Sequence, residues 1–307
     1  MKYDLEIGNK VVRIHDENNL IHLDFDFFAH AISSNTVDAD CNIKLFSDDI
    51  NLPKGIFRLQ GKLIEGVISN KLYSILVNRK VVIVSDKVNK VIDVYVEDNS
   101  INVMSIYSIF VCLKKHVAYI LFDEINLALH ASAVYNSSVK KAYVILGKSG
   151  SGKSSLSYYF IQHGMELLAD DILCMNSMTG RVSGSGGSLY VTDDFIHRFD
   201  IKKYQVVNPG RKARIDVPNI AISDIEIEAV LIAKGQSEQN AYEICDVAKY
   251  QDVIFEMQKK WMLSIGDKDL CKKKMNKLIE NIPKIYVMYL NHKTMENIGN
   301  LIVGELK

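Results

Sequence analysis

The sequence predicts an α/β fold with a β-rich amino-terminal region, and three observations lead to this prediction. An apolar run at 142–146 is followed by a glycine-rich loop and then by a helical pattern at 153–163, which gives the order strand, loop, helix. A second apolar run, at 165–169, follows this helix closely enough to complete a βαβ unit with parallel strands. Residues 1–100 instead alternate short apolar runs with polar turns, as strands do. We therefore expect two parts, 1–100 and 101–307, of which the second is the α/β core.

Strands should dominate the amino-terminal region. Short apolar runs bounded by polar residues occur at 20–25, 72–77, 81–84 and 91–96. A helical pattern at 104–124 then leads into the core. The region is either a separate domain or a layer on the core, and the absence of a linker rich in proline or serine favours close packing.

Residues 147–154 match the P-loop (Walker A) pattern G-x-x-x-x-G-K-[ST] between a predicted strand and a predicted helix. Its glycines let the backbone approach a phosphate, and its N–H groups and the positive end of the helix form an anion site. Lys153 is expected to reach the phosphates and Ser154 to bind Mg²⁺. A mere glycine-rich turn would explain neither the spacing nor the flanks. The predicted nucleotide-binding residues are Gly147, Lys148, Ser149, Gly150, Ser151, Gly152, Lys153, Ser154 and Ser155.

An acidic pair, Asp170 and Asp171, ends the second apolar run. Parallel strands have their carboxyl ends at one edge, so the pair should emerge beside the phosphate loop, where ligands of open α/β sheets bind. One carboxylate could hold Mg²⁺ while the other accepts a proton from an attacking hydroxyl. An Asp-Asp turn without chemistry is the simpler alternative.

His130 lies upstream, before a predicted hairpin. Asn136, Ser137 and Ser138 suit a turn that would pair 131–135 with 141–146 and return His130 toward the phosphate loop. A histidine there could contact phosphate or tune the acidic base. Taken alone, a histidine in an apolar stretch is more often a satisfied core residue.

In this order the segments 129–133, 147–156 and 164–171 resemble the HPr kinase/phosphorylase family. They resemble more closely a looser group of HPr-kinase-like proteins, some of which phosphorylate a serine of a ribosomally made peptide such as a lasso-peptide precursor. The resemblance implies a P-loop, phosphoenolpyruvate-carboxykinase-like α/β core that binds ATP and Mg²⁺ and transfers the γ-phosphoryl group to a serine hydroxyl. Carried over by motif, Asp170 is the catalytic base, Asp171 a metal or phosphate-side carboxylate, and His130 an active-site histidine. With the loop residues, the predicted catalytic residues are Asp170, Lys153 and His130, and the predicted metal ligands are Ser154 and Asp171.

Residues 181–189 depart from the family. The Leu-Glu-x-Arg-Gly-like strand of true HPr kinases is absent, so neither HPr as substrate nor the reverse phosphorolysis is inferred. The composition of serine and glycine predicts a mobile loop beside the site, with a bland flexible linker as the alternative.

The remaining chain is predicted to be scaffold, with a strand at 229–233, helices at 249–281, a strand at 283–290 and a closing helix at 293–303. A basic cluster follows the turn at Pro209. Lys212 or Arg214 could stabilise a migrating phosphoryl group, and a solvated basic loop is the simpler interpretation.

Composition excludes some classes of function. Lys and Arg number 37 and so do Asp and Glu, which argues against nucleic-acid binding. Five scattered cysteines are typical of reduced thiols. No apolar signal region opens the sequence, and charged residues at 114–116 interrupt its most apolar stretch, so we expect a cytoplasmic protein without membrane association.

Together these features predict a Mg-ATP-dependent kinase with a hydroxyl acceptor, and a serine of a protein or peptide is the favoured acceptor. Two alternatives stay open: a kinase acting on a small-molecule hydroxyl, and a P-loop ATPase switch that has no phosphoryl acceptor. The resemblance allows an oligomer, whose surfaces the sequence does not identify.

Overall fold

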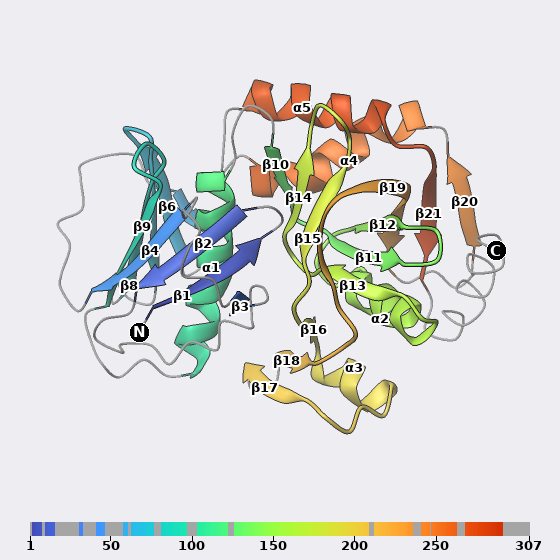
Figure 1. The fold of residues 1–307 in the computed structure, drawn as a ribbon, viewed down its shortest axis with the longest axis horizontal. Helices are drawn as coiled ribbons and strands as arrows, with labels where there is room; N and C mark the ends of the chain where they lie inside the picture. The colour runs from blue at the N-terminus through green and yellow to red at the C-terminus, as the bar shows by residue number, and fades with distance from the viewer. Residues whose placement is uncertain are drawn as a thin grey trace.

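The computed structural model is a mixed α/β protein with a β-rich amino-terminal sheet, as the sequence predicts (Figure 1). The division at residue 100 stays a prediction. The structure describes residues 2–7, 10–15, 31–32, 41–46, 58–60, 63–76, 81–96, 103–121, 126–208, 212–235, 241–245, 247–262 and 268–290.

The described part of the amino-terminal region forms one nine-stranded sheet with the order β3-β1-β2-β4-β9-β8-β7-β6-β5. The predicted strands at 72–77, 81–84 and 91–96 are confirmed as β7, β8 and β9, whereas the run at 20–25 lies outside the described residues. The strands are β1 (Lys2–Ile7), β2 (Lys10–His15), β3 (Ala31–Ile32), β4 (Cys41–Phe46), β5 (Arg58–Gln60), β6 (Leu63–Ile68), β7 (Lys71–Leu76), β8 (Val81–Asp86) and β9 (Val91–Val96).

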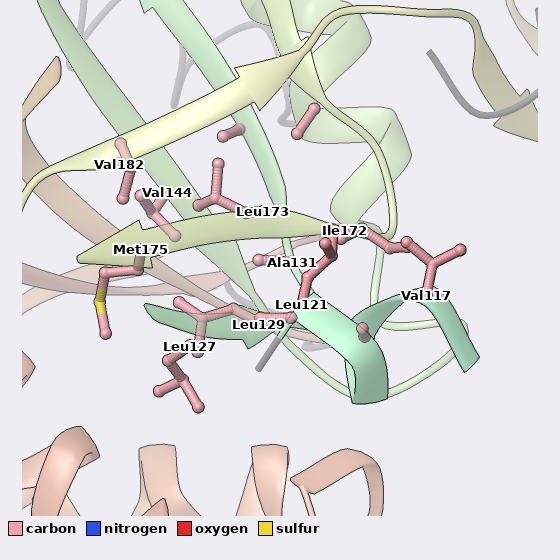
Figure 2. Close-up of a cluster of buried hydrophobic side chains, with 14 of the residues drawn as sticks. Val117, Leu121, Leu127, Leu129, Ala131, Val144, Ile172, Leu173, Met175 and Val182 are labelled. Carbon is pink, nitrogen blue, oxygen red and sulfur yellow. The ribbon is translucent and has the colours of Figure 1, made fainter. Parts of the chain in front are cut away.

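Helix α1 (Val103–Leu121) confirms the helix predicted at 104–124 and lies between the two sheets (Figure 1). It packs against β8 on one side and β10 on the other. Its buried Val117 and Leu121 lie in the same apolar cluster as Leu129 and Leu173 of the core (Figure 2). The cluster also includes Ile83 of the first sheet, so the two sheets share one continuous apolar interior.

The second nine-stranded sheet forms the core, with the order β10-β14-β15-β19-β12-β11-β13, and β21 and β20 continue from β19. It contains β10 (Asn126–Leu129), β11 (Ser132–Asn136), β12 (Lys141–Leu146), β13 (Glu166–Ala169), β14 (Leu173–Asn176), β15 (Val182–Ser185), β19 (Ala221–Lys234), β20 (Ala241–Cys245) and β21 (Ile285–Tyr289). The strands predicted at 229–233 and 283–290 are thereby confirmed.

Helices cover both faces of this core sheet. Alternate residues of β12 point to opposite faces: Val144 belongs to the cluster that contains α4 (Val247–Met262) and α5 (Lys268–Glu280), and Ile145 to the cluster that contains α2 (Lys153–Gln162). The helices predicted at 153–163 and 249–281 are confirmed. The closing helix predicted at 293–303 lies outside the described residues.

The βαβ unit has the predicted parallel strands, but they are not neighbours. Strand β11 lies between β12 and β13 and is antiparallel to each, which makes β12 and β13 parallel to one another. The predicted hairpin supplies this middle strand: Ser132 pairs with Ile145, and the Asn136 side chain accepts a hydrogen bond from the Ser138 N–H at 3.0 Å.

The prediction of a mobile loop at 181–189 is wrong. The segment contains β15, a short connection at 186–188 and the start of β16 (Leu189–Val191). A Cβ at Gly184 would lie 2.1 Å from the Leu168 carbonyl oxygen. The Gly186 N–H donates to that same oxygen at 2.9 Å. Glycine therefore serves close packing of two backbones here, not flexibility.

A three-stranded sheet of order β16-β18-β17 lies beside helix α3 (Asp193–Arg198). Thr192 is the N-cap of this helix, and its side chain accepts a hydrogen bond from the Phe195 N–H at 3.3 Å. The other strands of this sheet are β17 (Gln205–Asn208) and β18 (Lys212–Ile215). No helix in the described ranges is long and apolar enough to span a lipid bilayer.

Candidate functional site

Three chain segments converge at one edge of the core sheet. The loop at 147–152 leaves the carboxyl end of β12, Asp170 and Asp171 leave the carboxyl end of β13, and His130 precedes the amino end of β11. Because β11 runs antiparallel between the other two strands, its beginning lies beside their ends, and Ala133 pairs with Ala169. The topology thus brings together the three sequence motifs that were predicted to share a site.

The loop is shaped by close backbone packing. Gly147 is buried, and a Cβ there would lie 2.8 Å from the Ala233 carbonyl oxygen and 2.3 Å from the Ser151 Oγ. Gly152 has φ +97° and forms the N-cap of α2 without a side-chain cap, so the first N–H groups of this helix have no capping side chain. Such a turn, closed by a helix N-terminus, is of the kind that binds phosphate oxygens.

Lys153 begins α2 and lies over the loop. Its Nζ donates to the carbonyl oxygens of Gly147 at 2.9 Å and of Lys148 at 3.3 Å. The Oγ of Ser151 is buried and makes no hydrogen bond in the structure. An ammonium group and an unsatisfied buried hydroxyl in one glycine-rich turn fit a bound phosphate. Of the other predicted nucleotide-binding residues, Ser154 and Ser155 are half-buried in the first turn of α2, and Lys148, Ser149 and Gly150 are exposed.

Two buried hydroxyls connect the loop helix to the strand that carries the acidic pair. The Oγ atoms of Ser132 and Ser157 lie 2.7 Å apart. The Ser132 Oγ also lies 3.2 Å from the Ala169 carbonyl oxygen, and the Ser157 Oγ lies 3.1 Å from the Lys153 carbonyl oxygen. Because each hydroxyl donates one hydrogen, one serine donates to its carbonyl oxygen and the other donates to the first serine. This relay sets the position of the backbone just before Asp170 relative to the backbone of Lys153.

The two aspartates have different partners. The Oδ2 of Asp170 accepts a hydrogen bond from the Tyr190 N–H at 3.0 Å. Asp171 has φ +73°, and its Oδ2 lies 3.0 Å from the Nζ of Lys114. These separate environments are consistent with different tasks for the two carboxylates.

His130 is fixed through its backbone. The side chain of Gln258, which is 1% exposed, accepts from the His130 N–H at 2.9 Å and donates to the His130 carbonyl oxygen at 3.0 Å. The ring Nδ1 lies 3.3 Å from the Asp171 carbonyl oxygen, which can only accept, so Nδ1 carries the hydrogen and Nε2 is the acceptor atom of the neutral ring.

Burial and nearby charges shift the pKa of the His130 imidazole. Burial lowers its pKa from the usual 6.5, and the charges of Lys153 and Lys114 lower it further, against the carboxylate of Asp171, which raises it. Of these three charged groups, the Asp171 carboxylate lies 3.9 Å from the His130 Nδ1. The histidine is part of a charged cluster at the sheet edge, not a simple core residue.

The structure describes only part of the basic cluster at 211–214. Lys212 lies in β18, and its side chain is outside the described part of the structure. Arg214 pairs in register with Tyr190, the residue whose N–H binds Asp170, and its Nε lies 3.6 Å from Asp216. The proposed phosphoryl-stabilising role of either residue stays a prediction.

Sequence reasoning missed Lys114 and Gln258. Lys114 was noticed only as a charge that interrupts an apolar stretch, although its side chain is 5% exposed and reaches Asp171. A lysine inside an apolar helix rarely becomes buried without an opposite charge, so its position was a signal for a buried carboxylate partner. Gln258 gave no such signal, because a glutamine on an amphipathic helix is ordinary.

Acidic and hydroxyl side chains of this edge suit a magnesium ion. Mg²⁺ in nucleotide sites is held by one or two carboxylates together with phosphate oxygens and water, not by a closed protein cage. Ser154 and Asp171 offer the required oxygen atoms. In the described residues, no group of three or more His, Cys, Asp or Glu side chains is placed to hold a metal.

Comparison with known proteins adds one finding. The sequence matches no protein-family model and no curated protein. The structure is similar to that of the HPr(Ser) kinase/phosphatase from Coxiella burnetii, with 14% sequence identity over 58% of this chain and 95% of that chain, at a TM-score of 0.28. The case for a function therefore rests on the residues of the site.

Proposed function

We propose that this protein is a Mg-ATP-dependent kinase that transfers the γ-phosphoryl group to a hydroxyl, in particular to a serine of a protein or peptide. The core would then be a P-loop, phosphoenolpyruvate-carboxykinase-like core of the HPr-kinase-related kind. One observation carries the proposal: a phosphate-type loop and an aspartate pair lie at the ends of two parallel strands on one sheet edge.

The proposed reaction assigns a task to each group. The loop N–H groups and Lys153 hold the β- and γ-phosphates, while Ser154 and Asp171 hold Mg²⁺, which when bound neutralises charge on the phosphates. Asp170 accepts the proton of the acceptor hydroxyl as its oxygen forms a bond to the γ-phosphorus. The bond from that phosphorus to the bridging oxygen breaks, and ADP leaves with the electron pair.

The environments of the aspartates support Asp170 as the base. The Tyr190 N–H binds Oδ2 and thereby orients the carboxylate of Asp170 toward a fixed direction. An aspartate carboxylate is intrinsically a weak base for a hydroxyl, so positioning and late proton transfer must supply most of its effect. Asp171 is the carboxylate left for the metal ion, and its side chain is 37% exposed.

The experiment is to incubate the purified protein with γ-labelled ATP and Mg²⁺ in a size-fractionated cell lysate and to locate the label. Asp170→Asn is run in parallel as the variant that lacks the base. Asp194→Asn is the matched control, because that carboxylate is exposed on α3 and pairs with Arg198.

We expect label in a protein or peptide fraction. This label should be lost in Asp170→Asn and kept in Asp194→Asn. Label in small metabolites would change the acceptor class. Label only in free phosphate would overturn the kinase proposal in favour of an ATPase switch. Unchanged transfer in Asp170→Asn would remove this residue from the role of base.

A further inference from the structure

The ion pair between Lys114 and Asp171 reaches across the fold. Lys114 belongs to α1, the helix between the two sheets, and lies 57 residues before its partner. Its side chain is 5% exposed, whereas the carboxylate of Asp171 is 37% exposed. The ammonium group is thus held inside the protein while the carboxylate stays open to solvent.

This arrangement places a cation where the proposed function needs a metal ion. A buried ammonium group depends on its partner, since an unpaired buried charge is strongly unfavourable. A metal ion that binds the same carboxylate would lie close to the Lys114 Nζ, and the two positive charges would repel each other. Asp171 can therefore serve Lys114 or Mg²⁺ fully, but not both.

A second partner makes the exchange feasible. The Nζ of Lys114 lies 5.2 Å from the centre of the Tyr190 ring, within the range of a cation–π contact. When the carboxylate turns to a metal, the ammonium group keeps this aromatic face. Tyr190 is also the residue whose N–H holds Asp170, so it contacts Asp170 directly and is linked to Asp171 through Lys114.

Resting on the proposed function, we propose that Lys114 is a built-in competitor of Mg²⁺ for Asp171, which the ion must displace before the site binds Mg-nucleotide tightly. Lys114 acts through Asp171 and is a positioning residue. Its competition sets the Mg²⁺ concentration at which the site becomes occupied.

The test measures binding of a non-hydrolysable ATP analogue by calorimetry over a series of Mg²⁺ concentrations. Lys114→Met removes the charge and keeps an unbranched side chain that suits a helix. Lys115→Met is the matched control, because it removes the neighbouring charge of the same helix. Lys114→Gln is a second neutral variant, and circular dichroism establishes that each protein is folded.

In Lys114→Met the half-saturating Mg²⁺ concentration should fall by about tenfold or more, because a positive charge next to the metal is removed. Lys114→Gln should shift it in the same direction, and Lys115→Met should change it by less than about twofold, as expected for a more exposed charge. In an Asp171→Asn background, Lys114→Met should have no effect on it.

An unchanged or raised Mg²⁺ requirement in the folded Lys114 variants would overturn the competition and leave the kinase proposal standing. Weaker nucleotide binding in those variants at saturating Mg²⁺ would also overturn it, because Lys114 would then bind phosphate. No nucleotide binding in the unmodified protein would overturn both proposals.

Discussion

Replacing Gly184 with alanine tests whether the segment after β14 is a packed strand. The added Cβ would lie 2.1 Å from the Leu168 carbonyl oxygen and 2.7 Å from its carbonyl carbon. A close contact between a carbon and a carbonyl oxygen is roughly 3.3 Å, so one of the two backbones must move by about 1.2 Å. Both belong to strands, and overpacking without such backbone obstacles already costs about 1–3 kcal/mol. We therefore expect a loss of about 3 kcal/mol in the free energy of unfolding.

The assay is thermal unfolding followed by circular dichroism, in which this loss corresponds to a melting temperature lower by about 6 °C or more. The matched control is Gly235→Ala, whose Cβ would meet its nearest atom at an ordinary 3.7 Å. Because Leu168 lies two residues before Asp170, phosphoryl transfer should fall as well. An unchanged melting temperature in Gly184→Ala would refute the packing argument and return the segment to a loop.

Three further predictions concern the site and its support. Burial lowers the pKa of His116 from 6.5 to about 3, so on acidification the unfolded chain binds a proton at this residue before the folded protein does. The free energy of unfolding should therefore fall by about 2 kcal/mol between pH 6.5 and pH 5. Urea unfolding should show this pH dependence in the unmodified protein and not in His116→Gln, and an equal dependence in both proteins would contradict the assignment. Gln258→Leu should lower the free energy of unfolding by about 2–3 kcal/mol, because it leaves the N–H and carbonyl oxygen of His130 without their partners. A melting temperature like that of the unmodified protein would argue against a stabilising role of these two hydrogen bonds. Lys153→Met should weaken Mg-ATP binding or transfer by about a hundredfold, measured by calorimetry and labelled ATP, and retention of both would exclude Lys153 from phosphate binding.

The sequence predicted the core elements because their signals are local. The apolar run before the loop, the helix ended by Gly164 and the hairpin at Asn136 are each specified within a few residues, and all three are present. The common edge followed from the direction of the strands. The insertion of β11 between β12 and β13 could not be predicted, since strand order depends on pairing between segments distant in sequence.

The misassigned segment at 181–189 and the missed Gln258 have a common cause. Serine and glycine indicate flexibility only when nothing packs against them, and the contact of Gly184 with Leu168 is invisible in one dimension. The same holds for Gln258, which reaches His130 over 128 residues. Lys114 differs, because a charge in an apolar helix is a local signal whose meaning depends on finding the distant carboxylate.

Helix α1 links the first sheet to the proposed active site, because it carries Lys114 and packs against β8. Two residues beyond Lys114, the ring of His116 is fully buried and hydrogen-bonded to Ser74, at 2.8 Å, and to Ser85 of the first sheet. A fragment that begins after residue 100 would keep every predicted catalytic side chain, yet expose this ring and the apolar side of the helix that carries Lys114. Loss of activity in such a fragment would therefore measure the unfolding of a shared helix, and substrate searches should use the full chain.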